Sequence, residues 1–251
     1  MMPAEPRPCT NYKAIKHLLL SLLLCSVCPS LAADREVQLS TAPNVPPYLL
    51  DDNHGGIELD IIKLAFQEQN YQVKTTTGIS NSIIVKQEDP VNTQHLYLSD
   101  IFISYEDIAI SLQKKKFSLN RVQQLANHSI IAFPTASMIL DNTLNEIAIY
   151  NPDYQENHII NQITALYTET ADFILTDKNH FQHALEILKA NHLTLAINLN
   201  SPITTHKLYS TTSYKLATNS EAIKNAFNRG LNTIKKRKTY DNIWQRNIKA
   251  L

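Results

Sequence analysis

Glycine is scarce in this chain, with only four among 251 residues, at Gly55, Gly56, Gly78 and Gly230. Phosphate-binding loops of the G-x-G-x-x-G and Walker types need closely spaced glycines, because their backbone N–H groups must approach the phosphates. Neither spacing occurs in the chain. Nucleotide binding by these two routes is therefore excluded.

Cysteine occurs only near the start of the chain, at Cys9, Cys25 and Cys28. In residues 13–33 a basic start, a short Leu-rich run and a small-residue end follow one another, as in a secretory signal peptide. The apolar run is short for a membrane span, although an uncleaved anchor helix is the alternative. We therefore predict a signal peptide over residues 1–33, export to the periplasm, and a mature chain without disulfides.

An excess of either charge is also lacking, since 23 Lys and Arg residues balance 23 Asp and Glu residues. Nucleic-acid binding is normally marked by a strongly basic surface. The basic run at residues 235–238 is better interpreted as the end of a helix, where cations complement the helix dipole. We expect no nucleic-acid partner.

Motifs of common catalytic sites are missing as well. The chain contains no G-x-S-x-G and no H-E-x-x-H. His180 and His183 follow Asp177 at a spacing that suits zinc ligation, but no fourth ligand is evident, so a solvated helix face is the preferred interpretation. We expect no enzyme, no metal and no cofactor.

What the chain does contain is an alternation of helical and strand-like apolar segments. Apolar residues are 43% of the sequence, enough to bury a core in one or two domains. Helical spacing is found in residues 57–69, 154–167, 178–188 and 220–248. Strands are expected over residues 36–39, 71–76, 107–112, 171–177 and 193–199. The chain is therefore predicted to be an α/β protein.

The order of these segments resembles the extracellular solute-binding proteins of family 3, the amino-acid type that serves ABC transporters. Residues 44–73 (NVPPYLLDDNHGGIELDIIKLAFQEQNYQV) resemble the family's opening strand, turn and helix. Residues 227–246 (FNRGLNTIKKRKTYDNIWQR) resemble its C-terminal signature. The resemblance implies a two-lobed periplasmic-binding-protein type II fold, in which each lobe is a central sheet flanked by helices and two crossing strands join the lobes.

The resemblance also implies lobe limits and ligand contacts. Lobe 1 would comprise residues 34–107 and 207–251, and lobe 2 residues 108–206. The implied ligand-binding residues are Tyr48, Tyr105, Thr135, Ala136, Ser137 and Asp177. The tyrosines would be aromatic walls of the cleft, the loop 135–137 would bind a carboxylate through its N–H groups, and the aspartate would bind an ammonium group. Ordinary partly buried tyrosines and a helix N-cap at Asp177 are the alternatives.

One segment departs from the family pattern. Between the first helix and the crossing strand, the family normally has a further strand, helix and strand that supply an Arg for the ligand carboxylate. Residues 71–100 are too short for this and contain no Arg, only Lys74 and Lys86. Either Lys86 or the loop 135–137 takes the charge, or the ligand is not an α-amino acid, or binding is weak.

The function that the resemblance implies is capture of a small polar, amino-acid-like ligand in the periplasm. The protein would act as a monomer and deliver the ligand to an inner-membrane ABC permease. One alternative is a periplasmic sensing or interaction protein that reports to a membrane partner. A dehydratase-like enzyme with Asp177, Glu58 or Asp60 as acid or base is the other alternative.

Overall fold

A computed structural model describes residues 35–41, 45–50, 55–76, 79–88, 95–191 and 197–249. The predicted signal peptide at residues 1–33 lies outside these ranges. Within them, no helix combines the length and apolar character that a membrane crossing requires.

The first sheet has six strands in the order β2-β1-β3-β11-β4, and β5 also pairs with β11. Its strands are β1 (Arg35–Ser40), β2 (Tyr71–Thr76), β3 (Ser82–Lys86), β4 (Tyr97–Leu98), β5 (Ile103–Tyr105) and β11 (Thr212–Thr218). β1 runs parallel to β2 and β3, whereas β11 is antiparallel to β3. A late segment of the chain therefore completes a sheet that the first segments begin.

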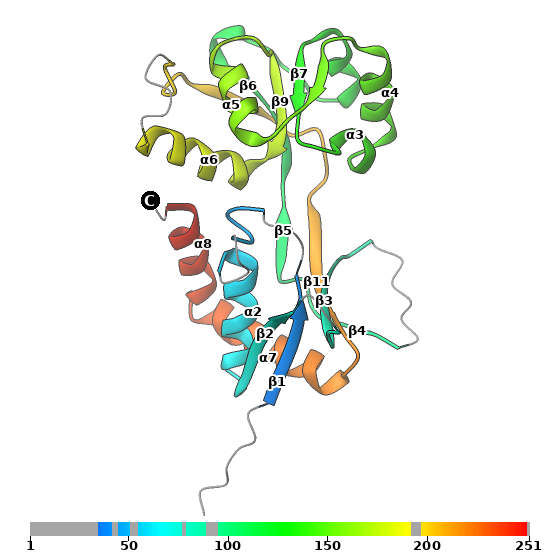
Figure 1. Cartoon of the computed structure of the whole chain (residues 1–251), viewed down its shortest axis with the longest axis vertical. Helices are drawn as coiled ribbons and strands as arrows, with labels where there is room; N and C mark the ends of the chain where they lie inside the picture. The colour runs from blue at the N-terminus through cyan, green and yellow to red at the C-terminus, as the bar shows by residue number, and fades with distance from the viewer. Residues whose placement is uncertain are drawn as a thin grey trace, which may run out of the picture. The chain divides into compact units, whose positions relative to one another are not determined.

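Two helices, α2 (Ile57–Gln67) and α7 (Glu221–Lys236), pack beside this sheet, and α8 (Thr239–Lys249) packs against both of them (Figure 1). In β1 the apolar side chains of Val37 and Leu39 are buried and the residue between them is exposed, as expected for a strand with one face on a core. Phe66 of α2 and Phe227 of α7 meet in this core with ring centroids 5.3 Å apart.

The second sheet has the strand order β10-β6-β9-β7-β8. Its strands are β6 (Asp107–Leu112), β7 (Ile130–Ala132), β8 (Tyr154–Glu156), β9 (Phe173–Asp177) and β10 (Ile203–His206). Its helices are η2 (Gln113–Lys115), η3 (Val122–Asn127), α3 (Ala136–Ile139), α4 (Asn142–Tyr150), α5 (Ile159–Tyr167) and α6 (Lys178–Ala190). Two clusters of buried apolar side chains form the core around this sheet.

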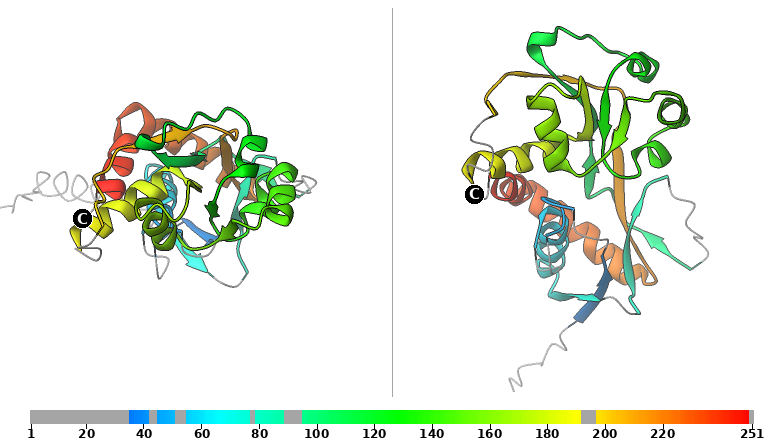
Figure 2. Two further views of the ribbon diagram at one scale, coloured as in Figure 1. Left: turned by 90° about the horizontal axis from the view of Figure 1, so that it is seen from above. Right: turned by 45° about the horizontal axis from the view of Figure 1, so that its top comes forward.

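Two connections join the sheets. β5 belongs to the first sheet and β6 to the second, and only Glu106 separates them. The chain returns from β10 to β11 through residues 207–211. The two connections run side by side (Figure 1 and Figure 2), because β6 pairs with β10 and β5 pairs with β11.

Two expected elements differ from the structure. The helix expected over residues 154–167 begins only at Ile159, because residues 154–156 form β8 and pair with β7 instead. In the strand expected over residues 193–199, the described part, residues 197–199, is not a strand. Leu199 is buried from a turn rather than from a strand. The remainder of that segment lies outside the described residues.

Candidate functional site

The carboxyl ends of β7, β8 and β9 lie at one edge of the second sheet, because these three strands are parallel. The chain leaves β9 at Asp177 and β8 at Glu156, and β7 leads into the loop 135–137. Side chains at such strand ends converge on ligands in many α/β proteins. The structure therefore places the lobe 2 residues of the predicted site at a common edge.

Asp177 is the N-cap of α6. Its Oδ1 accepts hydrogen bonds from the backbone N–H groups of Asn179 and His180, both at 2.9 Å, and its Oδ2 accepts one from Glu106 N at 3.0 Å. The side chain is only 7% exposed. Burial raises the pKa of Asp177 above its ordinary value in spite of these hydrogen bonds. Asp177 therefore caps α6 in the structure, and its buried carboxylate accepts these hydrogen bonds from neutral backbone groups.

Tyr48 connects the first sheet's core to this edge. It lies in the turn before α2, is 0% exposed and packs in the core of the first sheet. Its hydroxyl donates to Asp177 Oδ1 at 2.7 Å and accepts from Asn179 Nδ2 at 3.0 Å. The Tyr48 ring, which the sequence predicts as a cleft wall, is therefore buried in this structure. Its hydroxyl group takes the position at Asp177 that is predicted for an ammonium group.

The turn that holds Tyr48 depends on a glycine. Gly56 has a φ of 108°, and a Cβ there would lie 2.3 Å from the carbonyl oxygen of Tyr48. Only glycine adopts such a backbone readily and permits so close an approach. The first N–H groups of α2 bond to this turn, since Glu58 N donates to Tyr48 O at 3.0 Å. The start of α2 thereby fixes the backbone of Tyr48.

Tyr105 stacks on Tyr48 and binds a second buried carboxylate. The two ring centroids are 3.9 Å apart and the ring planes differ by 23°. The Tyr105 hydroxyl donates to Glu58 Oε1 at 2.5 Å. Burial raises the pKa of Glu58 to about 7, although the hydrogen bond from Tyr105 acts in the opposite direction. The sequence predicts Tyr105 as an aromatic wall of the cleft, and in the structure it stacks on Tyr48 and bonds to Glu58.

Asp107 adds a third acidic group near the carboxylates that these tyrosines bind. It begins β6 and pairs across the sheet with Asp177. Burial, together with the charge of Asp177, raises the pKa of Asp107 to about 6, and Lys86 acts in the opposite direction. The junction between the two sheets, which comprises Tyr48, Glu58, Tyr105, Asp107 and Asp177, is therefore acidic and aromatic.

Asp60, the other acid considered from the sequence, lies apart from this junction. It forms a surface ion pair with Arg246 at 2.6 Å.

The loop 135–137 binds a carboxylate that belongs to the chain itself. Thr135 N donates to Glu156 Oε2 at 2.7 Å, and Ser137 donates to Glu156 Oε1 through its N–H at 2.9 Å and its hydroxyl at 2.7 Å. Tyr154 OH donates to the same oxygen at 2.9 Å. Ala136 is buried and its N–H bonds to Phe133 O. The predicted anion-binding geometry is present, and Glu156 fills it.

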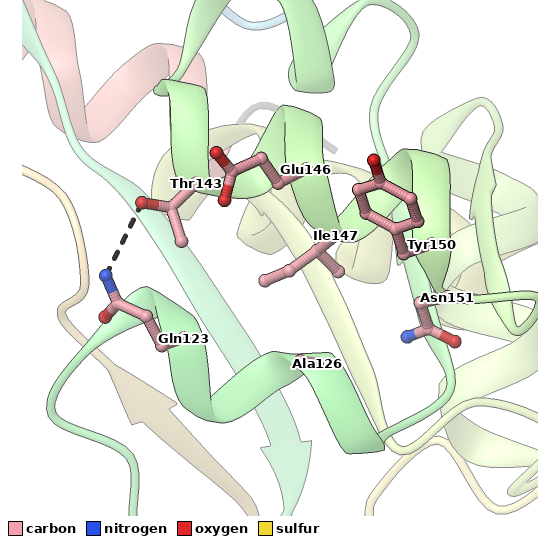
Figure 3. A pocket seen from close by; sticks show the side chains of 7 residues that line it. All are labelled: Gln123, Ala126, Thr143, Glu146, Ile147, Tyr150 and Asn151. Carbon is pink, nitrogen blue, oxygen red and sulfur yellow. Dashed lines mark hydrogen bonds between the residues drawn. The ribbon is translucent and has the colours of Figure 1, made fainter.

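A surface hollow of about 260 Å³ lies between η3 and α4 and contains none of these residues (Figure 3). It is lined by Gln123, Ala126, Thr143, Glu146, Ile147, Tyr150 and Asn151. Glu146 is its one carboxylic acid, and Gln123 and Thr143 bond to each other at 3.4 Å. Because this hollow contains none of the candidate site residues, we assign it no ligand.

The described ranges contain no group of three or more His, Cys, Asp or Glu side chains placed to hold a metal ion. His180 and His183 lie on α6, as their spacing predicts. Burial, and the neighbouring His183, lower the pKa of His180 to about 4. His183 is buried rather than on the solvated face that the sequence favours, because α6 contacts α8 on that side.

Neither a protein-family model nor a curated protein sequence matches the chain. Solved structures match it over most of its length. A substrate-binding protein of an amino acid ABC transporter from Streptococcus pneumoniae, bound to L-arginine, has 14% identity and a TM-score of 0.56, over 86% of this chain and 95% of that one. A histidine kinase sensor domain similar to periplasmic binding proteins has 12% identity and a TM-score of 0.57, over 85% and 96%.

A third solved structure is an ancestral amino-acid-binding protein described as a precursor of cyclohexadienyl dehydratase. It has 14% identity and a TM-score of 0.51, over 85% of this chain and 96% of that one. At these identities the likeness concerns the fold. The chain has the two-lobed α/β fold of these proteins, with a sheet and flanking helices in each lobe, and the fold predicted from the sequence is confirmed.

Proposed function

We propose that this protein is a periplasmic solute-binding protein that captures a small polar, amino-acid-like ligand between its lobes for an inner-membrane ABC permease. The observation that carries the proposal is the junction itself, where Tyr48 from the core of the first sheet meets Asp177 at the strand ends of the second. Two connections join the sheets, so a hinge motion there would open the junction to a ligand.

The lobe limits follow the sheets. We propose residues 34–107 and 207–251 as lobe 1 and residues 108–206 as lobe 2. The changes of sheet between β5 and β6 and between β10 and β11 support these limits, except that Asp107 already belongs to β6 of the second sheet. The ligand-binding residues proposed on this basis are Tyr48, Tyr105, Thr135, Ala136, Ser137 and Asp177. Glu156 occupies the hydrogen-bond donors of Thr135 and Ser137, so these loop residues would contact a ligand only after the Glu156 side chain moves away.

A sensing role is the second candidate, because a histidine kinase sensor domain shares the fold. Adjacent permease and ATPase genes would favour transport, whereas an adjacent kinase or cyclase gene would favour sensing. We propose that the protein is not an enzyme, and a dehydratase-like activity is the weaker alternative. The buried acids Glu58 and Asp177 are each bonded to a tyrosine, as expected of structural as well as of reactive groups.

Ligand capture at the junction can be tested by a thermal-shift screen of amino acids, polyamines and small organic acids. A ligand at a hundred times its Kd adds about 2.7 kcal/mol of stability, which should raise the Tm by roughly 5 to 10 °C. Asp177→Asn removes the charge but retains a good N-cap, so it should weaken binding by about 2 to 4 kcal/mol. The ligand-free protein should also lose about 1 to 3 kcal/mol of stability, because the Asn NH2 cannot accept the hydrogen bond from Glu106 N and Tyr48 would donate to a neutral oxygen. Affinity is therefore measured at a temperature at which the variant is folded.

The matched control for this screen is Asp153→Asn. Asp153 is exposed and precedes β8, so it lies at the opposite edge of the second sheet from Asp177. This variant should bind like the wild type in calorimetric titration. If no compound raises the Tm, the proposed function is wrong. If Asp177→Asn binds the ligand with unchanged affinity, the proposed role of Asp177 is wrong.

Export gives a separate prediction. Protein recovered from a periplasmic extract should begin near Ala33 or Asp34, because the Leu-rich run and the small residues before that point form a complete signal. Intact-mass measurement checks this. Leu22→Arg should interrupt the apolar run and leave the precursor uncleaved in the cell. Retention of residues 1–33 on most molecules of the exported wild type would contradict cleavage.

A further inference from the structure

Glu156 already satisfies the donors that the loop 135–137 offers to an anion. Two backbone N–H groups and one hydroxyl of the loop, together with Tyr154 OH, donate to its carboxylate. Burial opposes ionisation, but these hydrogen bonds prevail and lower the pKa of Glu156, so the side chain is charged at neutral pH. A second carboxylate at the same place would meet like charge and find its donors taken.

The arginines of lobe 1 do not offer a ligand carboxylate another binding partner in place of the loop 135–137. Arg229 bonds to Gln69, Arg237 to Glu68 and Arg246 to Asp60, and Arg35 lies over the ring of Tyr71. All four are thus engaged on side chains outside the junction. The segment 71–100, which would carry a carboxylate-binding Arg, contains none. An α-carboxylate would therefore enter the junction without a bidentate partner.

The acidic groups of the junction gather around its aromatic rings. Asp177, Glu58 and Asp107 are carboxylates at or next to the stacked rings of Tyr48 and Tyr105. Asp177 accepts its hydrogen bonds from one hydroxyl and three backbone N–H groups, all of them neutral, so no cation balances its charge within these bonds. Carboxylates and aromatic rings together recognise ammonium groups.

We propose that Glu156 stands in for the carboxylate of an amino acid, so that the junction takes an organic amine that has no α-carboxylate. The proposal rests on the proposed function, since it names the ligand class of the same site. Glu156 is then a specificity-determining residue. It keeps a ligand carboxylate from the loop 135–137, and Asp177 binds the ammonium group.

Matched pairs of ligands test this directly. Agmatine and arginine, cadaverine and lysine, and histamine and histidine differ within each pair only by the α-carboxylate. In calorimetric titration of the mature protein, at least one amine should bind at least tenfold more tightly than its parent amino acid. Glu156→Ala frees the loop donors, so it should raise affinity for that amino acid at least tenfold. Gln155→Ala, an exposed neighbour on β8, should leave both affinities unchanged.

The outcomes separate the inference from the function beneath it. If an amino acid binds the wild type as tightly as its amine, or if only ligands of another class bind, the inference is wrong and the proposed function stands. If no compound of the wider screen binds, both are wrong. The wild-type ratio within each pair decides the ligand class even if Glu156→Ala does not fold.

Discussion

Replacing Gly230 by alanine should destabilise the protein by about 3 kcal/mol. Gly230 lies in α7, and a Cβ there would fall 1.8 Å from the carbonyl oxygen of Ala65 in α2. The obstacle is backbone rather than a flexible side chain, so the two helices must separate. Separation would loosen the contact between Phe66 and Phe227. This steric cost outweighs the gain of about 1 kcal/mol that alanine normally brings to a helix interior.

Chemical denaturation of the ligand-free protein measures this loss. Asn232→Ala is the matched control, because Asn232 is exposed on the same helix and should change stability by no more than about 0.5 kcal/mol. A Gly230→Ala variant as stable as the wild type would show that α2 and α7 can accept a wider spacing.

Replacing Glu58 by glutamine should remove a pH dependence of stability. Burial raises the pKa of Glu58 to about 7, from an ordinary value of 4.5. The folded protein therefore binds a proton that the unfolded chain has released, and stability falls as the pH rises from about 4.5 through 7. The loss approaches about 3 kcal/mol above pH 7. The glutamine side chain would keep a hydrogen-bond partner for Tyr105 without this loss.

Denaturation at pH 4.5, 6 and 8 tests the prediction. Glu58→Gln and the wild type should be about equally stable at pH 4.5, and the variant should be the more stable by up to about 3 kcal/mol at pH 8. Glu186→Gln, at an exposed position, should leave the pH profile as it is in the wild type. If the stability of Glu58→Gln and of the wild type changes with pH in the same way, Glu58 has the same pKa in the folded and the unfolded protein, and the prediction is wrong.

Much of the fold can be predicted because its elements carry local signals. The apolar run at residues 107–112 is the crossing strand β6, and the helical spacing after Ile57 is α2. β8 has no such signal, because it is three residues long with a mostly exposed, polar sequence. The sequence alone therefore assigns its residues to the helix that begins at Ile159. A strand of this length is fixed by the free edge of β7 rather than by its own pattern.

The residues of the candidate site also differ in whether the sequence alone predicts them. The capping role of Asp177 can be predicted, since an Asp between a strand and a helix is a preferred N-cap. Glu156 cannot, because its place beside the loop 135–137 depends on the pairing of β8. The bond from Tyr48 to Asp177 joins residues 129 positions apart and depends on how two lobes meet. Glu156 has no sequence signal of its own, because the strand that it ends cannot be recognised from the sequence.

In the proposed ligand capture, the hydrogen bond between Tyr48 and Asp177 would compete with the ligand for Asp177. An amine that binds Asp177 must first displace the tyrosine hydroxyl, so only the open fraction of molecules can be loaded, and the apparent Kd is the intrinsic Kd divided by that fraction. A hydrogen bond to a charged group contributes about 1.5 to 3 kcal/mol, which weakens the apparent affinity by roughly ten- to a hundredfold. Occupancy would then rise gradually around this weaker apparent Kd, so ligand far below that concentration would leave most molecules empty.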